Sequence, residues 1–198
     1  MSNNERCLEI NKSMTDCTSK MRALYNLINV TLLDAEQDRT ELSSDFEKMI
    51  DYKDNVNSIL TDVSAVKKSE RPQVITRNKS KLKTIEKEAK QVKESFVSLL
   101  AKYKKVLKES LPLKVEYLKE VKELCNEFNA ILKDSEVEEY HKKGFSQQLK
   151  MVKLINAKTD ELISDYNVKR NQLDSDNEKF NALYDSVNSA ITQLQVSA

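Results

Sequence analysis

The chain has 198 residues, with one Gly, two Pro and no Trp, and 33% of its residues are charged. Tight turns depend on Gly and Pro for their backbone angles, so this composition excludes a turn-rich globular fold. Disorder is also disfavoured, because apolar residues recur along the chain at regular spacing. Long helices or a coiled coil fit the composition best.

The charge is unevenly distributed, although the net charge is only +1. Residues 1–66 carry 7 basic and 12 acidic side chains, residues 67–123 carry 17 and 8, and residues 124–198 carry 9 and 12. The corresponding net charges are −5, +9 and −3. One interpretation is that a basic helix packs between two acidic ones. The other is that the basic centre docks on an anionic partner, and the sequence leaves both open.

The cysteines and the N-terminus indicate the cellular compartment. Cys7, Cys17 and Cys125 are odd in number, have no CxxC spacing and fall at apolar helical positions, which indicates a reducing compartment. The N-terminal residues contain no apolar core of a signal peptide, and no apolar run reaches the ~18–20 residues of a membrane span. We therefore expect a cytoplasmic protein, and we expect any association with a membrane to be peripheral.

The first predicted helix covers residues 3–69. Its apolar residues alternate steps of three and four, which is a heptad seam. Leu27, Val30 and Leu33 widen this seam, as is typical of a helix with two partners. Pro72 lacks a backbone N–H and disfavours helical geometry at Arg71, so we expect a break over residues 70–76. The first part of the seam runs Cys7, Ile10, Met14, Cys17, Met21, Leu24, Ile28, Leu32 and Ala35.

The second predicted helix covers residues 77–143 and contains Pro112 near its midpoint. An interior Pro costs about 3 kcal/mol, which the packing of two long arms can absorb. Because apolar periodicity continues on both sides, we predict one helix that is kinked at Pro112. The alternative is a true turn over Ser110–Leu113, which would give four helices.

The second predicted break is at Gly144. Gly144 can take the left-handed angle that ends a helix, with Tyr140 and Phe145 supplying the accompanying apolar contact. A competing helix start is Ser135 with Glu138, which have capping-box spacing. We prefer the boundary at Gly144, which gives a third helix over 146–196. The predicted fold is all-α, a single domain over 1–198 that forms an elongated antiparallel bundle of three long helices with coiled-coil-like packing.

No motif in the chain indicates an enzyme. His141 is the only histidine, and it is expected in a turn, with Glu138 as the one carboxylate at metal-site spacing. Acidic pairs such as Glu138–Glu139 are typical of solvated helix faces. The sequence contains no Gly-rich phosphate loop, metal-spaced Cys/His set or nucleophile elbow. We expect no catalytic residue, no cofactor and no metal site.

The basic centre places six lysines on one side of the predicted middle helix. At 100° per residue they fall within an arc of about 80°, beside the apolar seam. Val97 and Ala101 lie between them on this face. At roughly 1 kcal/mol for each basic residue near an anionic membrane, the six would matter if they all reach one plane. The alternative is a solvated flank that neutralises acidic neighbours. This lysine row comprises Lys79, Lys83, Lys90, Lys93, Lys104 and Lys108.

Nucleic acid is not the expected partner of the lysine row. Arginine, which dominates base recognition, occurs only six times in the chain. Binding of single strands also needs exposed aromatic side chains beside the charges, whereas the aromatic residues here fall mainly in the seams.

Three long helices, a Pro-kinked basic middle helix, the breaks at Pro72 and Gly144 and the lysine row together resemble the architecture of a BAR domain. BAR domains are crescent-shaped homodimers that bind and bend anionic membranes. The resemblance implies a homodimer that contacts anionic phospholipid through the lysine row and senses or scaffolds curvature. It would place the dimer interface around Leu27, Val30 and Leu33. The alternative is a coiled-coil scaffold or adaptor subunit of a cytoskeletal or trafficking complex, with protein partners on its coiled-coil surface.

Overall fold

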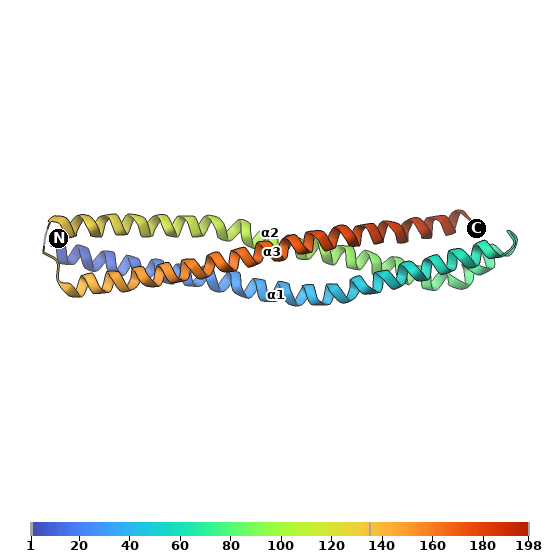
Figure 1. Ribbon diagram of the computed structural model, residues 1–198, viewed down its shortest axis with the longest axis horizontal. Coiled ribbons are helices and arrows are strands. Elements are labelled where there is room, and N and C mark those ends of the chain that lie inside the picture. The colour runs from blue at the N-terminus through green and yellow to red at the C-terminus, as the bar shows by residue number, and fades with distance from the viewer. Residues whose placement is uncertain (1, 135, 198) are drawn as a thin grey trace. The chain divides into compact units, whose positions relative to one another are not determined.

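The computed structural model describes residues 2–134 and 136–197, and three long helices make up most of them (Figure 1). α1 spans Asn3–Ala65, α2 spans Arg71–Asp134 and α3 spans Glu139–Val196. The predicted all-α bundle of three helices is therefore confirmed.

The chain forms two compact units, and each helix contributes a segment to both. Unit 1 comprises Met1–Asp34 and Tyr103–Val168, and unit 2 comprises Ala35–Lys102 and Lys169–Ala198. The chain was predicted to form a single domain over residues 1–198. The division into two units does not decide this, and the single domain stays a prediction.

The core of unit 1 joins one apolar stripe from each helix. Phe128 of α2 stacks on Phe145 of α3 with ring centroids 4.0 Å apart, and Tyr103 of α2 contacts Tyr166 of α3 at 4.6 Å. Since the numbers rise on α2 as they fall on α3, these two helices are antiparallel. The buried cluster comprises Cys7, Ile10, Met14, Cys17, Met21, Val121, Phe128, Ile131, Val137, Phe145, Val152 and Ile155.

The core of unit 2 follows the same pattern with different residues. Phe96 of α2 stacks on Phe180 of α3 at 5.0 Å, and both rings are buried. Burying side chains of this size contributes about 1.5–3 kcal/mol each. The other large buried side chains of unit 2 include Met49, Val56, Val63, Ile85, Leu173 and Leu194.

The polar contacts of unit 2 confirm the direction of α1 and α2. Tyr52 of α1 donates a hydrogen bond to Glu88 of α2. Lys81 of α2 donates to Asn55 Oδ1 of α1 at 2.8 Å. The α1 numbers rise as the α2 numbers fall, so the two helices are antiparallel.

A capping box that the sequence analysis overlooked starts α1. The Glu5 backbone N–H donates to Ser2 Oγ at 3.2 Å, and the Ser2 backbone N–H donates to Glu5 Oε2 at 2.5 Å. This reciprocal pair satisfies backbone donors that a helix start otherwise leaves unpaired. The Ser-x-x-Glu spacing was available in the sequence.

The first predicted break is displaced, because α1 ends at Ala65 and α2 begins at Arg71, six residues before the predicted start. The Glu70 carbonyl accepts hydrogen bonds from the backbone N–H groups of Gln73 and Val74 and so begins the helix. Pro72 falls in the first turn, where a missing N–H removes no helical hydrogen bond. Pro72 therefore starts α2 and does not lie in a loop.

The predicted break at Gly144 is wrong. Gly144 is the sixth residue of α3, and no glycine in the described residues has a positive φ. Of the two side chains predicted to accompany this break, Tyr140 is 74% exposed, whereas Phe145 is buried. α2 ends at Asp134, and the Glu138 carbonyl accepts the first helical bond of α3 from the His141 N–H at 3.0 Å.

The predicted capping-box partner of Glu138, Ser135, lies outside the described residues. The competing boundary is nevertheless closer to the observed one than Gly144 is, because α3 begins at Glu139.

Pro112 lies inside α2, which continues as helix through Ser110–Leu113. The alternative of a turn at this position, with four helices in total, is therefore wrong.

Candidate functional site

The lysine row lies on α2, and its four members in unit 2 are all exposed. None of the four, Lys79, Lys83, Lys90 and Lys93, forms an ion pair with a carboxylate among the described residues. Lys93 Nζ instead sits 4.5 Å from the centroid of the Tyr184 ring of α3. This cation–π contact holds one ammonium group at the flank of the row without neutralising it.

The other two members of the lysine row, Lys104 and Lys108, belong to unit 1. Both are exposed, and neither forms an ion pair with a described carboxylate. Each unit therefore presents unneutralised lysines of α2 to solvent.

Different lysines of α2 carry out the neutralisation of acidic helices. In unit 2, Lys102 pairs with Asp38 of α1. In unit 1, Lys114 Nζ lies 2.6 Å from Asp160 Oδ1 of α3. The internal interpretation of the basic centre thus holds for these two lysines and not for the lysine row.

One acidic residue interrupts the lysine row, and the sequence analysis overlooked it. Glu86 is exposed and lies between Lys83 and Lys90 in the chain. At 100° per residue it falls about 40° from Lys90, inside the same arc. Helical rotation applied to every residue, and not only to lysines, would have found it.

The widened stripe of α1 is solvent-exposed. Leu27 and Val30 are each 55% exposed and Leu33 is 63% exposed, and all three belong to unit 1. The homodimer interface predicted at these three residues stays a prediction.

His141, which was predicted to lie in a turn between helices, is buried in the first turn of α3. Its side chain is 8% exposed, and Asn11 Nδ2 of α1 donates to its backbone carbonyl at 3.2 Å. The described residues contain no group of three or more His, Cys, Asp or Glu side chains that could hold a metal ion. We read His141 as part of the contact between α1 and α3.

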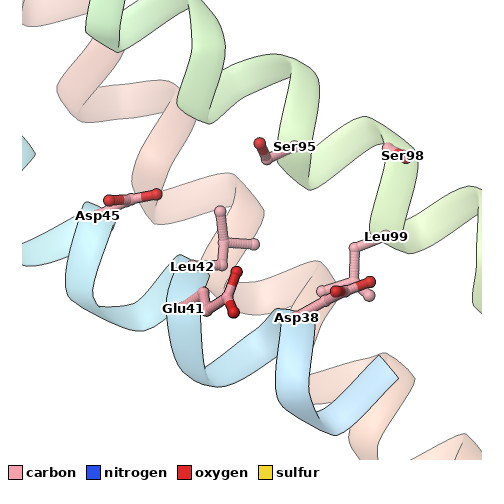
Figure 2. Close-up of a pocket in the computed structure, with 7 residues that line it drawn as sticks. All are labelled: Asp38, Glu41, Leu42, Asp45, Ser95, Ser98 and Leu99. Carbon is pink, nitrogen blue, oxygen red and sulfur yellow. The ribbon is translucent and has the colours of Figure 1, made fainter. Parts of the chain in front are cut away.

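A small open hollow between α1 and α2 of unit 2 is lined by three carboxylates, those of Asp38, Glu41 and Asp45. Two of its carboxylates are already engaged, Asp38 by Lys102 and Asp45 by Lys48 at 2.9 Å. Figure 2 shows the lining residues: Asp38, Glu41, Leu42 and Asp45 from α1, and Ser95, Ser98 and Leu99 from α2.

The cysteines and one tyrosine are kept in their neutral forms. Burial, together with Glu120, raises the pKa of the Cys17 thiol to about 11. Its Sγ donates to the Tyr117 carbonyl at 3.7 Å. Burial also raises the pKa values of Cys7 and Cys125, and it raises that of the Tyr166 hydroxyl to about 12. At neutral pH none of these groups is an activated nucleophile, because the nucleophile is the anion.

Within residues 2–134 and 136–197, no helix is sufficiently long and apolar to cross a bilayer. No protein-family model and no curated protein matches the chain. Among solved structures, a computationally designed three-helix bundle is similar to it, with 15% identity and a TM-score of 0.42 over 98% of this chain and 93% of that chain.

Proposed function

We propose that the protein is a peripheral membrane-binding, BAR-like helical bundle that contacts anionic phospholipid through the lysine row. One observation carries the proposal. Lys102 and Lys114 of the same helix pair with carboxylates of neighbouring helices, whereas the row members are exposed and form no ion pair with a described carboxylate. An exposed strip of ammonium groups attracts an anionic surface, at roughly 1 kcal/mol for each lysine that reaches it.

The proposal includes a bend of α2 at Pro112 and coiled-coil-like packing of the three helices. Pro112 cannot donate a backbone hydrogen bond to the carbonyl of Lys108, and its ring crowds the same turn. Spin labels at Lys104 and Lys119 would measure the bend, because a straight helix places them about 22 Å apart along its axis. A shorter distance that lengthens in Pro112→Ala supports the bend, and equal distances in the two proteins contradict it.

We further propose that the active form is a homodimer that covers Leu27, Val30 and Leu33 of α1. Three exposed aliphatic side chains within seven residues of one helix support this association. Light scattering is expected to give the mass of a dimer for the parent protein and the mass of a monomer for the double variant Leu27→Glu, Leu33→Glu. A monomeric parent protein would contradict the homodimer.

The same exposed residues favour the second candidate, a coiled-coil scaffold or adaptor. That candidate expects partner proteins on α1 and no preference for anionic lipid. The two candidates therefore differ in whether the lysine row is needed for binding.

Co-sedimentation with vesicles tests the lipid proposal. Wild-type protein is expected to bind vesicles that contain phosphatidylserine, to ignore phosphatidylcholine alone, and to release as salt is raised, because added ions screen exposed charges. Reversal of Lys79, Lys83, Lys90 and Lys93 to Glu is expected to weaken binding more than hundredfold. Binding that is equal for both lipid compositions, or unchanged by the reversal, would overturn the proposal.

A further inference from the structure

Val97 is an exposed apolar residue on the face of α2 that carries the row lysines of unit 2, one turn beyond Lys93. Its side chain is 61% exposed, whereas Val92 and Leu99 of the same helix are buried. By helical rotation it points within about 20° of Lys90. Ala101, one turn further on, is also exposed. The same face thus offers both cations and a small apolar ridge.

A soluble polyanion would gain no binding energy from the apolar ridge formed by Val97 and Ala101. Phosphates on a nucleic acid or a sulfated polysaccharide would contact the ammonium groups and leave Val97 in water. A bilayer differs, because its acyl region begins directly below its phosphates. Lysine side chains can extend along such a surface and keep their ammonium groups at phosphate level while a shorter residue reaches deeper.

We infer that Val97 enters the boundary between headgroups and acyl chains when the lysine row binds, so that the ligand of this face is a lipid bilayer and not a soluble polyanion. The inference rests on the proposed function and names the insertion that accompanies it. Lys93 helps to fix the depth, because its contact with Tyr184 holds the ammonium group one turn from Val97. Binding then combines charge attraction, which salt screens, with apolar burial, which salt does not weaken.

Val97→Thr tests this directly, because it replaces a methyl group by a hydroxyl group at nearly constant shape. We expect the partition coefficient into phosphatidylserine vesicles to fall about fivefold, in line with the loss of roughly one buried methyl group. Affinity for heparin, a soluble polyanion, is expected to stay unchanged. Ile50→Thr is the matched control, since Ile50 is 45% exposed on α1 of the same unit and lies off the lysine row.

A fluorescence measurement gives a second readout, because the chain contains no Trp. Val97→Trp should shift its emission to the blue on vesicles and be quenched by brominated lipids, whereas Ile50→Trp should show neither change. Failure of the wild-type protein to bind vesicles would overturn the proposed function itself. Wild-type binding with an unaffected Val97→Thr, or an equal loss of heparin binding in that variant, would overturn the insertion alone.

Discussion

Two sets of lysines on α2 differ in what lies opposite them. Lys102 and Lys114 point along the flanks of the helix and reach Asp38 of α1 and Asp160 of α3. The lysine row is exposed and forms no ion pair with a described carboxylate, and its Lys93 contacts the Tyr184 ring of α3. The comparison teaches that the direction of each lysine on α2 decides whether it reaches a carboxylate of a neighbouring helix or stays exposed to solvent.

The largest effect is expected in the core of unit 2, where α3 packs on the apolar side of α2. Phe180→Ala removes a ring that stacks on Phe96 inside unit 2, and we expect a loss of about 3–5 kcal/mol in the free energy of unfolding. Urea denaturation followed by circular dichroism measures it. Substitution of an exposed row lysine such as Lys90 by Ala should change this free energy by less than about 0.5 kcal/mol. Equal losses of unfolding free energy in the two variants would contradict the distinction between the buried apolar side of α2 and its exposed lysine row.

The buried titratable side chains of the core are expected to make the stability of the fold depend on pH. The pKa of Tyr166 is raised from 10.0 to about 12 in the folded chain by burial. Between these values the unfolded chain has lost the proton and the folded chain keeps it, so stability should fall as pH rises from about 10 to 12. The buried Cys17 thiol adds a similar fall between pH 9.0 and about 11.

Thermal unfolding at several pH values measures this fall, with Tyr166→Phe as the control. The variant should lose the part of the fall that lies between about pH 10 and 12. A Tyr166→Phe profile that matches the parent would show that Tyr166 ionises equally in both states.

The flank of α3 that faces α1 is expected to tolerate a gain of one methyl group. A Cβ at Gly144 would lie 3.6 Å from Asn11 Nδ2, which is an ordinary contact distance. Because Gly144 is helical, Gly144→Ala should raise the free energy of unfolding by about 0.5–1 kcal/mol. Urea denaturation measures this free energy. A lower free energy of unfolding in Gly144→Ala would indicate the left-handed conformation that the sequence predicted for Gly144 and would contradict the helical one.

The smallest effect is expected for a paired lysine. Lys102→Ala removes the ion pair with Asp38, and exposed pairs of this kind contribute between 0 and about 1 kcal/mol. Vesicle binding should stay within about twofold of the parent, since Lys102 points away from the lysine row. If Lys102→Ala lost as much vesicle binding as Lys90→Ala, the direction of a lysine on α2 would not matter for binding, and total charge alone would determine it.

The helical fold was readable from the sequence because its signal repeats many times. All nine seam positions predicted between Cys7 and Ala35 are buried. The exposure of Leu27, Val30 and Leu33 could not be read in the same way. An apolar residue beside a seam can cover a neighbouring helix or remain open, and only the arrangement of the three helices decides this.

The ends of the helices were harder to predict, because one residue can serve two roles. Gly144 has the chemistry of a helix stop, yet the helix continues through it where α3 packs on Asn11 of α1. Pro72 has the chemistry of a break, yet it occupies a first turn. The low helix propensity of Gly costs about 1 kcal/mol, which is less than the free energy that the packing of a long apolar stripe contributes. Tertiary contacts therefore decide the helix ends here.

Helical rotation placed six lysines on one face of the middle helix, and all six are exposed, while their role as lipid contacts stays a prediction. The rotation did not reveal that Lys93 rests on Tyr184 or that Lys102 and Lys114 are paired across helices. Those contacts depend on the register between helices, which a single helical pattern does not contain.

The most direct test of the central claim compares two variants of identical net charge. Lys83→Glu with Lys90→Glu alters the lysine row, and Lys48→Glu with Lys179→Glu alters exposed lysines of α1 and α3 in the same unit. Binding to phosphatidylserine vesicles at physiological salt should fall at least tenfold in the first variant and stay within about threefold of the parent in the second. Equal losses in both variants would show that total charge, and not the lysine row, governs the binding.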